Sequence, residues 1–508
     1  MSTGTQSSPL LIGPADQFSA LRQALDRLGY TESAICQRVG IDSIFEFRTI
    51  REDRKTGVEL NDALDTLIRL LMDEEVLSDV ELRLLPPGTL EQMEQLGVVE
   101  RIGSQPVKWY ATVVLYPVAG LYVASDRTFL PGGTEPRDLP TDAVYAAITG
   151  NTGRFVSFLP QDPCEDLLDL CAGTGVGALI AGARFAKRAW AADLGQRCAH
   201  FAEFNRLLNG LDNVTSVQGD LYEAVGDRAF DRIVAHPPYV PNQDRSLLFR
   251  DGGEDGEQIL ARIIQGLPKH LRPGGSFYCI TAATDREGET FEQRIRRWLG
   301  ESESEFDVLL VAIEYQRKPE AFLEAVVSAK GRFGELGPTS QLFRKLKVTG
   351  SFYGAVVLQR AESQRAVATA RGVKGRTAGP EILEWFRKWE TAAAGAGFRA
   401  FLYNARPRMS KHLKLVVTHS LQEGGLLPSE FLLRSGYPFQ SEAKIEPWVA
   451  ALVGSCNGEF STREIYQELK RQEVISPQLG EDGLAGVLCL LISAGFLDVP
   501  EFALPERS

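Results

Sequence analysis

Two segments of the chain carry side chains whose types and spacing could do chemistry. The first is Asp166-Leu-Leu-Asp-Leu-Cys-Ala-Gly-Thr-Gly-Val-Gly177, an apolar run that continues into a glycine-rich loop. The second is Phe230-Asp-Arg-Ile-Val-Ala-His-Pro-Pro-Tyr239, another apolar run, which ends in a histidine, two prolines and a tyrosine. Glycines let a backbone approach a ligand closely, and a histidine can accept or donate a hydrogen bond. Together the segments predict a nucleotide-shaped cofactor held beside a planar polar target.

The elements around the glycine loop predict that it follows a buried strand. Asp166 to Leu170 has the length and apolar character of a parallel strand in a sheet core. A helix that begins near Val176 would direct its free amide groups at an anionic group. The spacing of Gly173, Gly175 and Gly177 fits the dinucleotide pattern G-x-G-x-x-G poorly, because the last glycine comes one place early. A tight turn without a ligand is therefore the alternative interpretation.

Acidic residues end the next two predicted strands. Trp190-Ala-Ala-Asp193 is a strand whose acid follows the loop at the distance typical of a ribose ligand in doubly wound sheets. Val214-Thr-Ser-Val-Gln-Gly-Asp220 ends in a second acid, which we expect on the adenine side. Either acid alone could be a helix cap or a solvated loop residue. Two of them at successive strand ends favour a cofactor site.

These segments resemble the class I S-adenosylmethionine-dependent methyltransferases, within them the HemK-type protein glutamine methyltransferases and the amino-methylating nucleic-acid enzymes. Those groups carry Asn-Pro-Pro-Tyr after the fourth strand, where this chain has His-Pro-Pro-Tyr. The run Leu248-Phe-Arg-Asp-Gly-Gly-Glu-Asp-Gly-Glu-Gln-Ile-Leu-Ala-Arg-Ile-Ile264 also looks like the acidic glycine-rich segment that follows this motif in HemK-type enzymes. The resemblance covers residues 141–361.

The resemblance implies an α/β fold, a seven-stranded doubly wound (Rossmann-like) sheet whose last strand is antiparallel, with S-adenosyl-L-methionine as the cofactor. It implies catalytic roles for His236, Pro237, Pro238 and Tyr239. The cofactor-binding residues that it implies are Asp169, Cys171, Gly173, Thr174, Gly175, Asp193, Leu194, Asp220, Leu221 and His236.

His236 is the departure from the family pattern. An asparagine amide offers an acceptor and two donors, whereas a neutral imidazole offers one of each and a protonated one can only donate. His236 could accept a hydrogen bond from the target, act as a general base with a pKa near 6 to 7 if unperturbed, or be structural. The prolines fix the turn that aims the side chain, and Tyr239 offers a flat face to a planar group.

Composition restricts the class of protein. The five histidines are scattered and no Cys-x-x-Cys pair occurs, so we expect no metal. The seven scattered cysteines fit a reducing cytoplasm. A net charge of −12 and a pI of about 5.2 argue against nucleic-acid binding by bulk charge. The amino-terminal sequence is not typical of a signal peptide and no apolar run is long enough to span a membrane, so we expect a cytoplasmic protein.

The 508 residues predict more than one domain. We expect a helical, winged-helix-like domain over residues 1–125, the methyltransferase domain over 126–361, a linker over 362–379 and a second winged-helix-like domain over 380–508. In the first domain the sequence predicts helices over 15–30, 31–39 and 57–72 and two strands over 107–123. In the last domain it predicts helices over 380–393, 445–456, 461–471 and 484–494, with Ser461 as a helix cap. Residues 51–101 hold thirteen acids and six bases, which favours protein contact or scaffolding over DNA binding for the first domain. The basic segment Arg406 to Lys414 leaves nucleic-acid binding open for the last domain.

The rest of the predicted sheet consists of Ser276 to Thr281, Phe306 to Tyr315 and Gly350 to Gln359. Gln316 to Thr349 is either a substrate-facing flap or a solvated helical excursion. The leading functional hypothesis is N-methylation of an amide or amino group on a macromolecule, most simply a protein glutamine. The alternatives are an RNA or DNA base N-methyltransferase and a non-catalytic winged-helix regulator that senses S-adenosylmethionine.

Overall fold

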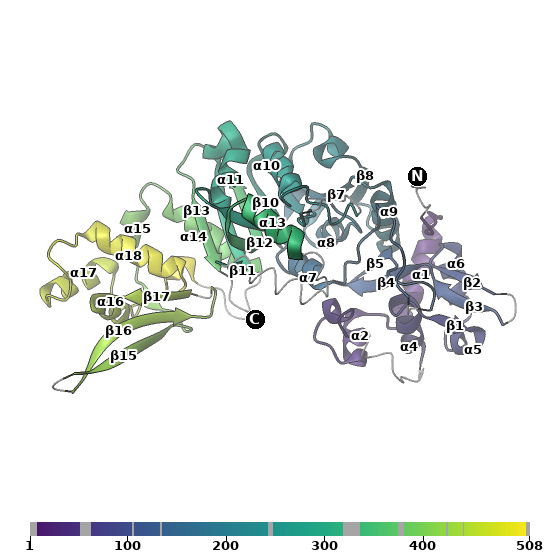
Figure 1. Cartoon of the computed structure of the whole chain (residues 1–508), viewed down its shortest axis with the longest axis horizontal. Coiled ribbons are helices and arrows are strands. Elements are labelled where there is room, and N and C mark those ends of the chain that lie inside the picture. The colour runs from purple at the N-terminus through teal and green to yellow at the C-terminus, as the bar shows by residue number, and fades with distance from the viewer. Residues whose placement is uncertain are drawn as a thin grey trace. The chain divides into compact units, whose positions relative to one another are not determined.

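The structure is a computed structural model, and it describes residues 8–50, 62–103, 106–132, 135–241, 247–317, 336–373, 380–422, 425–439 and 441–503. The chain forms two compact units (Figure 1). The first contains residues 1–272 and 277–280, and the second contains residues 273–276 and 281–508.

The amino-terminal part of the first unit is mainly helical. Its elements are α1 (Ala15–Arg27), α2 (Glu32–Val39), η1 (Ile44–Glu46), α4 (Ala63–Leu67), η2 (Ile68–Met72), β1 (Val76–Ser78), α5 (Asp79–Leu82), α6 (Thr89–Gln95), β2 (Val99–Ile102) and β3 (Lys108–Ala111). Strands β1, β3 and β2 form a small antiparallel sheet in that order. The helices predicted near residues 15–30 and 31–39 are confirmed, and Thr31 caps α2 by accepting from the backbone of Ala34. Part of the predicted helix from Gly57 to Met72 lies outside the described residues.

The predicted two-stranded segment Val107 to Val123 differs from the structure. It contains β3, β4 (Val113–Val118) and the start of β5 (Leu121–Asp126), and β4 pairs with β5 instead of with β3. Both β4 and β5 are buried along their whole length. Because neither strand alternates between apolar and polar positions, the sequence period does not mark where one strand ends and the next begins.

The glycine loop and the His-Pro-Pro-Tyr segment belong to a parallel sheet. Its elements in the first unit are α7 (Gly150–Ser157), β6 (Cys164–Leu170), α8 (Val176–Arg184), β7 (Ala186–Asp193), α9 (Gln196–Asn209), β8 (Val214–Gln218), η3 (Leu221–Val225), β9 (Phe230–Ala235) and α10 (Gln258–His270). Strand β6 lies between β7 and β9, and β8 pairs with the far side of β7, all parallel. The carboxyl ends of these strands therefore carry the loops in which the sequence predicted the site.

The remaining sheet elements lie mainly in the second unit. They are β10 (Leu271–Arg286, which has residues in both units), α11 (Phe291–Leu299), η4 (Gly300–Glu305), β11 (Phe306–Gln316), α13 (Leu336–Lys345), β12 (Val348–Arg360) and β13 (Thr369–Val373). The strand order is β13-β11-β12-β10-β9-β6-β7-β8. The antiparallel pairing of β11 with β12 agrees with the expected antiparallel last strand. The segment Gln316 to Thr349 was predicted as a flap or a helical excursion. Its part from residue 318 to residue 335, which includes Lys318, Lys330 and Arg332, lies outside the described residues.

The expected count of seven strands is wrong, because β13 is an eighth strand within the predicted linker. It pairs parallel with β11 although its sequence has little apolar content. Arg371 in β13 forms two hydrogen bonds with Asp285 and two with Glu292, with N···O distances of 2.6 to 2.9 Å. Neutralisation of this arginine by two carboxylates lets a charged segment join the sheet, which a composition rule does not anticipate.

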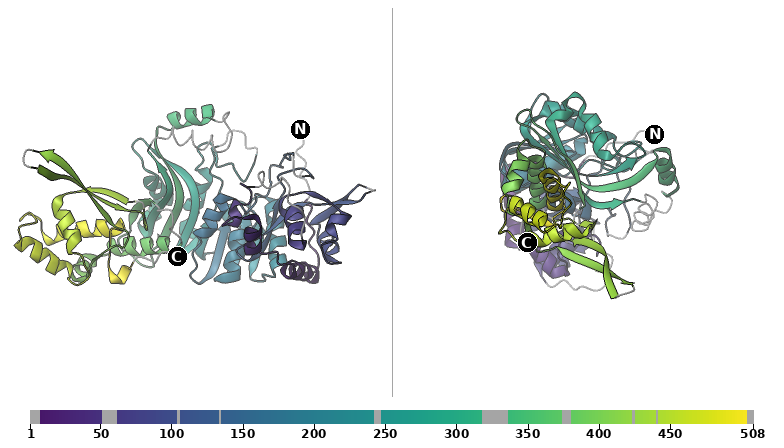
Figure 2. Two further views of the ribbon diagram at one scale, coloured as in Figure 1. Left: turned by 90° about the horizontal axis from the view of Figure 1, so that it is seen from below. Right: turned by 90° about the vertical axis from the view of Figure 1, so that its left-hand side faces the viewer.

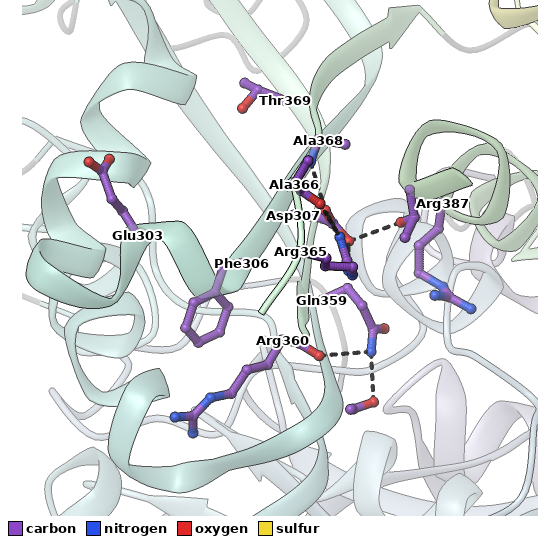
Figure 3. A network of polar contacts seen from close by, with 12 residues as sticks. Glu303, Phe306, Asp307, Gln359, Arg360, Arg365, Ala366, Ala368, Thr369 and Arg387 are labelled. Atoms are coloured by element: carbon purple, nitrogen blue, oxygen red, sulfur yellow. Dashed lines mark hydrogen bonds and ion pairs between the residues drawn. The ribbon is translucent and has the colours of Figure 1, made fainter. Parts of the chain in front are cut away.

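A second polar network fixes the chain after β12 (Figure 3). The carboxylate of Asp307 in β11 is fully buried and accepts hydrogen bonds from both Nη atoms of Arg365, with N···O distances of 2.9 and 2.6 Å. It also accepts from the backbone of Ala368 at 2.7 Å and from the hydroxyl of Thr391 at 2.9 Å. Four donors thus satisfy one buried charge and hold both the segment before β13 and the following helix against β11.

The carboxy-terminal elements include a sheet that the sequence analysis did not predict. They are α14 (Pro380–Ala393), α15 (Phe398–Asn404), β14 (Arg408–Met409), β15 (Lys414–Gln422), β16 (Gly425–Ser435), β17 (Ser441–Ile445), α16 (Pro447–Ser455), α17 (Thr462–Arg471), α18 (Glu481–Ser493), β18 (Leu497–Asp498) and η6 (Pro500–Phe502). The predicted helices are confirmed, and Ser461 caps α17 with Glu464 in a capping box. A three-stranded antiparallel sheet, β15-β16-β17, precedes the last three helices. The winged-helix assignments of both terminal regions stay predictions.

None of the helices in the described part of the chain is long and apolar enough to cross a membrane. Among the described residues, no three His, Cys, Asp or Glu side chains gather as a metal site would require.

Candidate active site

The glycine loop leaves β6 through a backbone that turns sharply. Cys171 has a φ of 57°, Gly173 a φ of 54° and Gly175 a φ of 79°, all in the left-handed region. A Cβ on Gly175 would lie 3.0 Å from the Cβ of Ala202 in α9, so this glycine permits close packing as well as the turn. No described atom lies within 4 Å of the place where a Cβ on Gly173 would be. The loop therefore keeps open space at Gly173.

Asp169 is buried at the base of the loop and braces helix α8. Its Oδ2 accepts a hydrogen bond from the backbone of Ala178 at 3.0 Å. A Cβ on Gly177 would lie 2.6 Å from the same oxygen, so only glycine fits there. Burial, reinforced by the charge of Asp193, raises the pKa of Asp169 to about 7. The contacts of Asp169 are those of a residue that shapes the loop from behind.

Asp193 ends β7 with its carboxylate turned toward the glycine loop. One oxygen accepts from the backbone of Gly173 at 2.8 Å and the other from Gly195 at 2.9 Å. Burial raises the pKa of Asp193, while these backbone donors and the Cys198 thiol favour the charged form. The Asp193 side chain is also partly exposed, so its carboxylate stays accessible to the hydroxyl groups of a ligand.

The other predicted cofactor residues lie around the same strand ends. Burial is the largest cause of the raised pKa of the Cys171 thiol. The nearby charges of Asp193, Asp169 and Asp220 raise it further by smaller amounts. Asp220 precedes Leu221, which has a φ of 51°, and Asp220 forms an ion pair with Arg262 of α10 at 2.8 Å. Sequence reasoning did not include Arg262, which competes for the carboxylate assigned to the adenine side. The two remaining residues differ, since Thr174 is buried and Leu194 is exposed.

His236 follows β9 and is held against an aromatic ring. Its imidazole stacks on Phe155 of α7, with ring centroids 5.4 Å apart and planes inclined by 19°. The ring centroid of Tyr239 lies 6.2 Å from that of His236. Desolvation lowers the pKa of His236 to about 4, below the value of 6 to 7 expected for an unperturbed imidazole. The stack on Phe155 that covers one face of the imidazole is a tertiary contact, because α7 lies far from His236 in the sequence.

Tyr239 is positioned by residues that the sequence analysis did not identify as part of the site. The side-chain amide of Asn151, also in α7, donates to the Tyr239 hydroxyl at 3.0 Å. The acidic glycine-rich segment lies close to the backbone of Tyr239. A Cβ on Gly252 would lie only 2.9 Å from the Tyr239 Cα, which is too close for any residue other than glycine without a shift. A Cβ on Gly256 would lie 2.6 Å from the Tyr239 carbonyl oxygen. The glycines of that segment were visible in the sequence, whereas nothing there marked Asn151 or Phe155.

Two of the other histidines, His200 and His270, have structural partners away from the candidate site. His200 hydrogen-bonds the Leu10 carbonyl through Nε2 at 2.9 Å, and His270 hydrogen-bonds the Arg228 carbonyl through Nδ1 at 2.8 Å. His270 also stacks on Tyr222 with centroids 4.3 Å apart. His236 is thus set apart by its motif and by its position at the end of β9.

Comparison with known proteins places the site within one family domain. Residues 146–305 match the methyltransferase small domain. The chain is 33% identical over 161 residues to the ribosomal protein uL3 glutamine methyltransferase of Bradyrhizobium diazoefficiens, which covers 29% of this chain and 50% of that protein. It is 33% identical over 135 residues to a Methanocaldococcus jannaschii protein named as a protein N5-glutamine methyltransferase, covering 25% of this chain and 68% of that protein.

A third relative is the release factor glutamine methyltransferase of Thermodesulfovibrio yellowstonii, 30% identical over 124 residues, or 22% of this chain and 44% of that protein. The chain spans about half the length of most of these curated relatives. The range that matches the family model, residues 146–305, contains the glycine loop and the His-Pro-Pro-Tyr segment.

Proposed function

The chain belongs to the S-adenosylmethionine-dependent methyltransferases that include the protein glutamine methyltransferases, and from this premise we propose that it methylates the side-chain amide nitrogen of a protein glutamine. The observation that carries the proposal is the environment of His236. A pKa of about 4 makes this imidazole neutral at cellular pH, so it presents one acceptor nitrogen. A primary amide supplies the matching N–H donor.

S-adenosylmethionine supplies a methyl group that is already activated on a sulfonium sulfur. Gly173 and Asp193 are the residues we assign to hold it, with Asp193 binding the ribose hydroxyls. The open space at Gly173 and the partly exposed carboxylate of Asp193 support this fit. We assign Asp220 to the adenine side, where Arg262 must share or release its carboxylate.

In this mechanism His236 orients the amide of the target. An N–H hydrogen bond to its neutral nitrogen directs the amide nitrogen toward the methyl carbon, and the nearly parallel stack on Phe155 limits rotation of the imidazole. Tyr239, held by Asn151, offers its ring face to the planar amide. The gain is positional, as expected when the electrophile needs no further activation.

The transfer would form a carbon–nitrogen bond as the bond between the methyl carbon and sulfur breaks, with the electron pair going to sulfur, which leaves as a neutral thioether. The amide nitrogen then loses one of its two protons. A nitrogen-alkylated amide cation is far more acidic than an imidazolium with a pKa of about 4, so even this weakly basic imidazole can take the proton. The acceptor and general-base roles of His236 are therefore successive roles of one nitrogen in this mechanism.

Comparative mass spectrometry tests the substrate class. Protein and RNA digests from cells with and without the gene should differ by a methyl group on a glutamine of a protein, and complementation with the wild-type gene should restore it. Complementation with His236→Ala is the matched control and should not. A methyl group that is lost from RNA but from no protein would contradict the proposal.

Purified variants test the residue roles. Asp193→Ala should weaken S-adenosylmethionine binding by about ten- to a hundredfold in calorimetry, as expected for the loss of a charge-assisted hydrogen bond. His236→Asn restores an acceptor and should keep activity, whereas His236→Ala should lose activity with cofactor affinity nearly unchanged. If the asparagine variant is as inactive as the alanine variant, the acceptor role fails.

A further inference from the structure

The sheet formed by β15, β16 and β17 has two different edges. At one edge, β17 is five residues long and carries charges, with Glu442 paired to Arg434 at 2.7 Å and Lys444 paired to Glu430 at 2.8 Å. Short length and charge are the features that protect a sheet edge from further pairing. At the other edge, β15 is nine residues long and its only charged residue other than histidine is Lys414. Within the described part of the chain, β15 pairs with β16 alone.

The hairpin of β15 and β16 also exposes apolar side chains. It projects away from helices α16 to α18 in both orientations (Figures 1 and 2). Leu421 is 82% exposed and its cross-strand partner Leu426 is 67% exposed. Leu415 is 47% exposed, although its cross-strand partner Leu433 is fully buried. A β-bulge interrupts the pairing at Thr418 and His419, but its extra residue, Ser429, lies in β16, so β15 itself is continuous. Apolar groups on a long edge with little charge favour addition of another strand.

The sequence of β15 is self-complementary about Thr418. If two β15 strands run antiparallel with Thr418 opposite Thr418, then Leu415 of each lies opposite Leu421 of the other. Val417 then lies opposite His419, and Lys414 opposite position 422, a glutamine in the sequence. Leucine pairs and the threonine pair are favourable cross-strand neighbours, and the two lysines do not face one another.

We propose that two copies of this chain associate through their β15 strands, antiparallel, about a two-fold axis at Thr418. The pairing is isologous, as expected for a symmetric dimer, and joins two three-stranded sheets into one of six strands. It uses the unprotected edge of each sheet and leaves the charged β17 edge outside. It is independent of the proposed enzymatic activity.

Engineered cysteines test the register. In Thr418→Cys, two cysteines opposite one another have Cα atoms about 4.5 to 5.5 Å apart, within the range of a disulfide. Mild oxidation should therefore convert the full-length variant to a covalent dimer. The wild-type chain gives the background from its native cysteines, and Ser441→Cys on the β17 edge is the matched control. Equal cross-linking of Ser441→Cys and Thr418→Cys would overturn the proposal.

A mixing experiment makes the test specific to the antiparallel register. Leu415→Cys and Leu421→Cys should cross-link when the two variants are mixed. Each variant alone should cross-link much less, because equivalent cysteines would be separated by about six residues, or about 20 Å, along the strands. Cross-linking of Leu421→Cys alone, at the level of the mixture, would contradict the register.

Charge variants test association without covalent capture. Analytical ultracentrifugation of the full chain should show a concentration-dependent dimer. Thr418→Lys and Thr418→Glu each place like charges opposite one another and should raise the dissociation constant by about fivefold or more. An equimolar mixture of the two should recover the dimer, whereas Ser441→Lys should behave as wild type. A wild-type chain that stays monomeric at every concentration would overturn the proposal, and circular dichroism checks that each variant is folded.

Discussion

The pKa of His236 is the property of the site that can be tested most directly, because no substrate is needed. At pH 6 a histidine with a pKa of about 4 is about 1% protonated, whereas one with the ordinary value of about 6.5 is about 75% protonated. Carbon-13 labelling of the imidazole rings gives one NMR signal for each of the five histidines. The signal absent from His236→Asn identifies His236, and it should stay at its neutral position from pH 8 down to about pH 5.

The same shift predicts a pH dependence of stability with a defined sign. Because the folded state holds His236 at a pKa of about 4, it binds fewer protons than the unfolded state between pH 4 and 6.5. The contribution of His236 to the free energy of unfolding is therefore fully present above pH 6.5, and it is lost as the pH falls toward 4. It amounts to at most about 3 kcal/mol, an upper bound because the side chain is partly exposed. Asp169, with a pKa raised to about 7, acts with the opposite sign, since its contribution is lost as the pH rises from about 4 to 7.

Comparison of wild type with His236→Asn separates these two effects, since both proteins retain Asp169. Urea denaturation at pH 7 and pH 5 gives the free energy of unfolding of both proteins. On going from pH 7 to pH 5, the free energy of unfolding of the variant should increase relative to that of the wild type.

Added free imidazole serves as an internal pH reference in the NMR titration. A midpoint of 6 to 7 for the His236 signal would refute the desolvation argument and return the residue to the value expected from sequence.

Three further predictions concern the supports of the site and of the sheet. Gly252→Ala should lower the turnover number with S-adenosylmethionine affinity unchanged in calorimetry, because its Cβ would displace the Tyr239 backbone; unchanged turnover would mean that the segment adjusts freely. Asn151→Ala removes a hydrogen bond worth about 0.5 to 1.5 kcal/mol and should reduce kcat/KM by up to about tenfold in steady-state assays, with no change in cofactor affinity. Asp307→Ala leaves Arg365 without its carboxylate and should lower the unfolding free energy by about 3 to 5 kcal/mol in urea denaturation, an effect that a solvated ion pair would not produce.

Some elements missed by the sequence analysis did have a local signal. The apolar runs Leu415-Val-Val and Phe431-Leu-Leu flank Gly424-Gly425, a pattern typical of a hairpin. The basic residues between Arg406 and Lys414 directed attention to nucleic acid instead. Strand β13 had no such signal, because its pairing depends on carboxylates from β10 and α11 that neutralise Arg371.

The sequence by itself determined the strand, glycine loop and helix around Gly173, the acids at successive strand ends and the motif that contains His236. These features follow from local requirements, since left-handed turns favour glycine and buried parallel strands need apolar runs. Only the tertiary structure decided that His236 stacks on Phe155 and that Asn151 holds Tyr239. The imidazole pKa depends on which atoms replace water around the ring, and one of the groups beside it, Phe155, comes from a helix whose sequence carries no mark of that role.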